Sequence, residues 1–128
     1  MKSDSLIDLG RSAARGLLIP AIIVIAWGEL VPGLSLPIWD KALHFTAYFG
    51  LGLLAWIAFH RRGLAGWAVL GMIVLGGLLE IVQGYVGRDA DIYDEIANAL
   101  GALSGAGIAY GVRRLLAARG LVDRPPAD

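Results

Sequence analysis

Five polar residues suited to chemistry lie within otherwise apolar segments: His44, Glu80, Gln83, Asp94 and Asn98. Glu80 and Gln83 are three residues apart and Asp94 and Asn98 are four apart, so each pair occupies one face of a helix. Because polar side chains that face lipid are costly, these faces should turn inward and meet. An imidazole beside carboxylates could perform general acid–base catalysis, bind a divalent metal ion, or hold a polar headgroup without turnover.

Four further polar residues flank this group. Asp40 lies four residues before His44 and is well placed to cap a helix, and Asp91 could cap the last helix. Lys41 and Arg88 are suited to contact phosphate, or could be snorkelling charges at the interface. We interpret three residues as candidate catalytic groups: His44, Glu80 and Asp94. The candidate ligand-binding residues are Asp40, Lys41, Gln83, Arg88, Asp91 and Asn98.

Several of these residues and their neighbours could instead have a purely structural role. Asn98 could be a contact between helices, and the spacings Gly101-x-x-x-Gly105 and Gly107-x-x-x-Gly111 are expected to serve helix packing. We interpret Glu29 and His60 as boundary residues, and Phe45 and Tyr48 as core or interface aromatics. The chain has no Cys, which excludes thiolate metal sites, and no other spacing identifies a metal or a cofactor.

The elements that must position these residues are apolar. Of the 128 residues, 57% are hydrophobic and only 17% charged, too few polar residues for a soluble domain of this size. Apolar segments cover about residues 16–31, 41–59, 64–86 and 92–116, and a helix needs roughly 20 residues to cross a bilayer. The first is the shortest and carries Pro20 near its start. We predict an all-α membrane protein, one four-transmembrane-helix domain over residues 1–120, with a disordered tail over 121–128.

The basic residues indicate the orientation. With four spans, nine of the 11 Lys and Arg residues lie on one side, which the positive-inside rule makes cytoplasmic together with both termini. These nine are Lys2, Arg11, Arg15, Arg61, Arg62, Arg113, Arg114, Arg119 and Arg124. The opposite side collects seven acidic residues: Glu29, Asp40, Glu80, Asp89, Asp91, Asp94 and Glu95. The candidate site is therefore expected at the extracytoplasmic face.

Three runs in this chain resemble the VanZ-like family. Their patterns are D-K-x-x-H from Asp40, E-x-x-Q from Glu80 and R-x-x-D-x-x-D-x-x-x-N-x-x-G from Arg88. The resemblance covers about residues 39–111, without departure in the motifs, and is specific only as a combination. It implies an integral membrane protein of the bacterial cell envelope, in a family named for a protein associated with teicoplanin resistance. The family's motif positions are Asp40, Lys41, His44, Glu80, Gln83, Arg88, Asp91, Asp94 and Asn98.

Together these features favour a multi-pass protein of the bacterial inner (cytoplasmic) membrane that binds a lipid-linked or amphiphilic envelope molecule in an extracytoplasmic-facing pocket. Chemical modification of that molecule, and a link to glycopeptide (teicoplanin) resistance, are extensions of this hypothesis. The alternative is a non-enzymatic membrane scaffold whose polar residues only stabilise the helix bundle. A transporter fits less well, because its substrate site usually lies near the midplane. Membrane lipids are expected partners, and no basic patch suited to nucleic acid is present.

Overall fold

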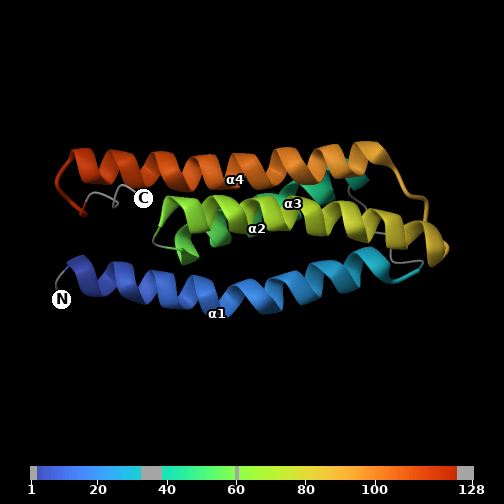
Figure 1. Ribbon diagram of the computed structural model, residues 1–128, viewed down its shortest axis with the longest axis horizontal. Coiled ribbons are helices and arrows are strands. Elements are labelled where there is room, and N and C mark those ends of the chain that lie inside the picture. The colour runs from blue at the N-terminus through green and yellow to red at the C-terminus, as the bar shows by residue number, and fades with distance from the viewer. Residues whose placement is uncertain (1–2, 33–38, 60, 124–128) are drawn as a thin grey trace.

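The computed structural model describes residues 3–32, 39–59 and 61–123. Within these ranges the chain forms four helices and no strand: α1 (Ser3–Leu30), α2 (Asp40–Ala58), α3 (Arg62–Tyr85) and α4 (Ile92–Ala118). The helices lie along one long axis and consecutive helices run antiparallel (Figure 1). The start of α1 and the end of α4 therefore lie at the same end of the bundle. The all-helical prediction is confirmed.

Three of the helices are long and apolar enough to cross a membrane: α1 over Ser5–Leu30, α2 over Asp40–Ala58 and α3 over Gly63–Tyr85. Helix α4 is also long, with 27 residues, but it is less apolar. Glycine and alanine, which are only weakly apolar, make up much of its middle. The structure thus supports a multi-pass membrane protein with three such helices.

Helix α1 begins much earlier than the apolar pattern indicates. It starts at Ser3 rather than near residue 16, and Pro20 lies inside it rather than near its start. The first turns are amphipathic, with Arg11 bound to Asp8 at 3.0 Å. Apolarity marks only the part of a helix suited to lipid, whereas the helix itself can continue into the interface. A proline inside a membrane helix is tolerated where neighbouring groups satisfy the backbone carbonyl it leaves free.

Helix α2 is the central helix and packs closely on α4. A Cβ atom at Gly101 or Gly105 would collide with a backbone oxygen of α2, and one at Gly52 would collide with the backbone oxygen of Ala102. The two backbones therefore touch, as small residues allow in membrane helices. The expected packing role of Gly101 and Gly105 is confirmed.

The second glycine pair behaves differently. A Cβ atom at Gly107 or Gly111 would meet no atom within 4 Å. The prediction that this pair serves close helix packing is wrong within this chain, because the face that carries it turns away from α2. Spacing alone does not specify which of two overlapping glycine pairs faces the neighbouring helix.

Some expectations fall on segments outside the described residues. These include His60 at the turn between α2 and α3 and most of the tail after Leu121. Trp39, directly before α2, is among the described residues and is 72% exposed within this chain. A large aromatic side chain left uncovered at the end of a span is suited to the membrane interface.

Candidate functional site

Six buried polar side chains lie at one end of the bundle, where α1 ends, α2 begins, α3 ends and α4 begins. We call these residues the polar cluster: Glu29, His44, Glu80, Gln83, Asp94 and Asn98. They converge because the antiparallel arrangement brings the starts of two helices to the ends of the other two. Each residue is at most 8% exposed, so its polar side-chain atoms need hydrogen bonds from the protein or from a ligand.

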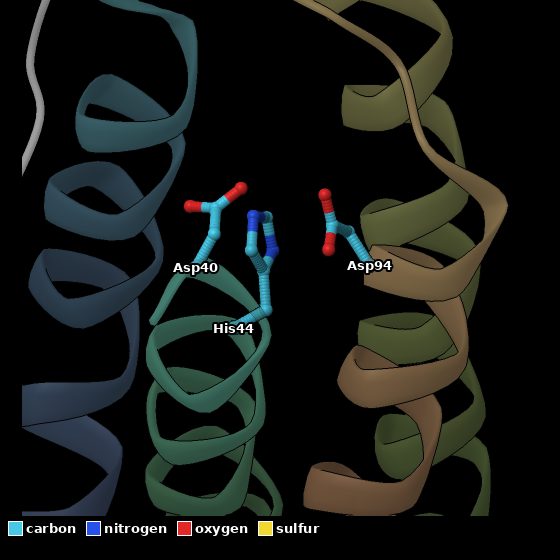
Figure 2. Close-up of side chains that lie close together, drawn as sticks. All are labelled: Asp40, His44 and Asp94. Carbon is cyan, nitrogen blue, oxygen red and sulfur yellow. The ribbon is translucent and has the colours of Figure 1, made fainter. Parts of the chain in front are cut away.

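His44 occupies the centre of the polar cluster. Its Nδ1 lies 3.0 Å from Oδ1 of Asn98 and 3.6 Å from Oε1 of Glu29. Figure 2 shows its ring standing between the carboxylates of Asp40, on the same helix, and Asp94, on α4. Potential ligand atoms of these three residues all lie within 4.8 Å of one another. The structure thus brings two candidate catalytic residues, His44 and Asp94, into one site.

The orientation of Asn98 is fixed by a neighbour on its own helix. Its Nδ2 donates to Oε2 of Glu95 at 3.2 Å, which leaves Oδ1 to face His44. Room for this pair exists because residue 76 is glycine: a Cβ atom there would lie 2.7 Å from Oε2 of Glu95 and 3.0 Å from Nδ2 of Asn98. Helix α3 therefore contributes a gap rather than a side chain at this position.

Lys41 joins α2 to the start of α4. Its Nζ donates to Oδ2 of Asp91 at 2.6 Å and to Oδ1 of Asp94 at 2.9 Å. The Lys41 ammonium, helped by the backbone N–H of Tyr93, holds the pKa of Asp91 below its usual range. Asp91 also caps α4, since its Oδ1 accepts from that N–H at 2.9 Å. The expected cap at Asp91 is confirmed.

The expected cap at Asp40 is wrong. Trp39 is the N-cap residue of α2, its side chain makes no capping hydrogen bond, and Asp40 is the first helical residue. A residue inside the first turn points along the helix flank rather than back over the free N–H groups. The carboxylate of Asp40 is thereby left beside His44 (Figure 2).

Arg88 and Gln83 fasten the end of α1. Arg88 donates through Nη1 to the carbonyl oxygens of Gly28 at 3.0 Å and Val31 at 3.4 Å. Gln83 donates through Nε2 to the carbonyl oxygen of Glu29 at 3.1 Å. The last carbonyls of a helix lack partners within it, and cations there are favoured by the helix dipole. Both residues thus stabilise the bundle.

The site holds more acids than bases. Lys41 and Arg88 are the two Lys or Arg residues described at this end, against six carboxylates in and around the cluster: Glu29, Asp40, Glu80, Asp91, Asp94 and Glu95. Glu80 accepts the Asp91 N–H through Oε1 at 2.6 Å. Its Oε2, and Oε1 of Glu29, are buried and have no hydrogen-bond partner among the described residues. Buried carboxylates in excess demand protons, a cation or a hydrogen-bond donor.

The sequence reasoning missed Glu29, Glu95 and Tyr48 as members of this site. Glu29 is 8% exposed and its Oε2 faces the hydroxyl of Tyr48 at 3.5 Å. Its position at the end of an apolar segment made it look like a boundary residue. The available signal was its predicted depth, which matches that of Glu80 once α1 and α3 run parallel.

The fold and this site define a class: helical multi-pass membrane proteins with a buried cluster of acids and one histidine at one end of the bundle. Residues 8–116 match the model of the family described as VanZ/LLP1, and the chain belongs to that family. The resemblance seen in the three sequence runs is therefore confirmed over most of the chain.

One curated relative is a protein of the fission yeast Schizosaccharomyces pombe that is described as uncharacterized. It is 35% identical over 95 residues, which cover 71% of this chain and 59% of the relative. The chain thus spans less than two thirds of that relative's length. No solved structure matches the chain.

Proposed function

We propose that the polar cluster binds the polar headgroup of a membrane amphiphile. The observation that carries this proposal is a pair of buried carboxylate oxygens, on Glu29 and Glu80, that have no hydrogen-bond partner in the described part of the chain. A headgroup that donates hydrogen bonds through hydroxyl or amino groups would satisfy them. The expectation that Lys41 and Arg88 contact phosphate receives less support, because both already bind groups of the chain.

The same groups are suited to chemistry on a bound headgroup. An imidazole nitrogen of His44 and the carboxylate of Asp94 lie close enough to share a proton with a hydroxyl placed between them. A lipid-linked cell-wall precursor would be the ligand that connects this protein to glycopeptide (teicoplanin) resistance. An ordinary phospholipid would instead give a general membrane role, which the eukaryotic relative favours.

A second candidate function is a scaffold in which polar residues only lock the helices together. Three of the candidate ligand-binding residues favour it, since Lys41, Gln83 and Arg88 each bind a different helix or its flanking loop. The scaffold does not account for the unpartnered oxygens of Glu29 and Glu80, which weaken a lock rather than strengthen it.

A lipid-binding experiment separates the two functions. The purified chain and its variants His44→Ala and Glu80→Ala would be mixed with fractionated envelope lipids, and retained lipids identified by mass spectrometry. We expect wild type to retain one class of amphiphile at least 10-fold above both variants. An Asp89→Asn variant, which changes an exposed acid at the same end, should match wild type. Equal retention by all four folded proteins would support the scaffold, and a product formed only by wild type would show catalysis.

We further propose that all four helices span a bacterial cytoplasmic membrane, with both termini in the cytoplasm. The excess of basic residues on one side and the shared position of the first turn of α1 and the last turn of α4 support this orientation. A reporter that is active only in the cytoplasm should be active when fused to the C-terminus. An inactive fusion on an intact, inserted chain would contradict the four-span topology.

A further inference from the structure

We propose that a divalent transition-metal ion binds at the N-terminal end of α2, where its ligands are His44, Asp40 and Asp94. Potential ligand atoms of the three residues lie within 4.8 Å of one another, so small movements of the side chains would let one ion contact all three. Figure 2 shows the far end of the imidazole ring directed into the space between the two carboxylates. The inference is independent of the proposed amphiphile.

The hydrogen bonds around His44 prepare one ring nitrogen for a metal. Because Nδ2 of Asn98 donates to Glu95, Oδ1 of Asn98 must accept, so Nδ1 of His44 carries the proton. The Nε2 atom then keeps its lone pair. Histidines that bind metals usually donate their other N–H in this way, which fixes the tautomer and the ring orientation.

Glu29 gives a separate indication of a missing cation. Glu29 is buried, and its Oε1, which has no hydrogen-bond partner among the described residues, lies 3.6 Å from Nδ1 of His44. A carboxylate left without a donor beside an imidazole is stabilised when that imidazole gains positive character, as it does on binding a cation. The excess of acids over bases in the site acts in the same direction.

The ligand atoms of His44, Asp40 and Asp94 indicate which metal ions this site would prefer. One imidazole and two carboxylates suit first-row ions such as Zn²⁺, Mn²⁺ and Fe²⁺, whereas the imidazole nitrogen disfavours Ca²⁺, which takes oxygen ligands. Lys41 binds Oδ1 of Asp94 at 2.9 Å and so holds that carboxylate in place. Three protein ligands leave a position open for water or a headgroup oxygen.

A metal titration tests the inference without any lipid ligand. The full chain, without an affinity tag and stripped of metals with a chelator, would be titrated with Zn²⁺ by calorimetry and with Co²⁺ by visible absorption. We expect one ion per chain, and at least 10-fold weaker binding in His44→Gln and in Asp40→Asn. Asp40 is exposed, so Asp40→Asn keeps the test informative if the His44 variant fails to fold.

Asp89→Asn serves as the matched control, because Asp89 is an exposed acid at the same end of the bundle outside the triad. It should bind metal as wild type does. Absence of a one-to-one site in wild type would overturn the inference. Equal affinity in wild type and Asp40→Asn would also overturn it, by showing adventitious binding elsewhere. The amphiphile proposal is tested by lipid retention and would stand or fall separately.

Discussion

Replacing Gly105 with alanine should lower the free energy of unfolding by about 3 kcal/mol, at the upper end of the range for overpacking. The added methyl group would collide with the backbone oxygen of Phe49 and approach the backbone nitrogen of Leu53 at 2.9 Å. Backbone atoms cannot rotate away as a side chain can, so α4 must shift off α2. Because His44 lies on α2 and Asp94 on α4, the shift should also weaken the binding of any ligand at the site.

The control is Gly107→Ala on the same helix. Its methyl group would meet no atom within 4 Å, so alanine should stabilise the helix by up to about 1 kcal/mol through its higher helix propensity. The two variants would be compared by thermal and denaturant unfolding in the same detergent. Equal effects of the two substitutions would contradict direct backbone contact between α2 and α4.

Replacing Asn98 with alanine should lower the free energy of unfolding by about 2 kcal/mol, because the buried imidazole of His44 and the half-buried carboxylate of Glu95 each lose a partner. Asn98 is fully buried and bonds both His44 and Glu95. Removing it leaves the imidazole N–H and a carboxylate oxygen without the amide. It also releases the His44 tautomer, so the Asn98→Ala variant should bind Zn²⁺ more weakly even where it folds.

Thr46→Ala is the reference for this second prediction. It removes a 2.7 Å hydrogen bond from an exposed hydroxyl to the carbonyl of Ala42 on its own helix. Its effect should stay within about 0.5 kcal/mol, as for most surface substitutions. An Asn98→Ala variant as stable as Thr46→Ala would mean that Asn98 contributes nothing to the polar cluster.

Much of the fold follows from simple patterns in the sequence. The last three apolar segments predict α2, α3 and α4 to within two residues at each end. This works because lipid forces each span to be a continuous helix, so that length and apolarity suffice. The same reasoning fails for α1, whose first turns are amphipathic and therefore helical without being continuously apolar.

The sequence predicts which residues form the candidate site better than it predicts what each of them contacts. Depth and spacing select His44, Asp94 and Asn98, and the structure joins them. Spacing cannot show that Arg88 turns to the carbonyls at the end of α1, since that contact depends on how the helices pack. Nor can it separate Glu29 from an ordinary boundary residue, because burial there depends on side chains of other helices.

A ligand site and a set of residues that only stabilises the bundle differ in how they affect the free energy of unfolding. A residue retained only to lock the bundle should contribute to stability, whereas a residue retained for a ligand is tolerated at a cost to stability. Asn98, with both ends of its amide bonded, fits the first description. Glu29, with a buried oxygen left free of partners among the described residues, fits the second.

The most direct test of the polar cluster as a ligand site is the unfolding free energy of Glu29→Gln, measured without metal or added lipid. Glutamine keeps the shape of the side chain and an oxygen that can accept from Tyr48, but removes a buried carboxylate. We expect Glu29→Gln to be more stable than wild type by about 1 kcal/mol. A loss of stability of similar size would show that the Glu29 carboxylate holds the bundle together, and would contradict the ligand-site account.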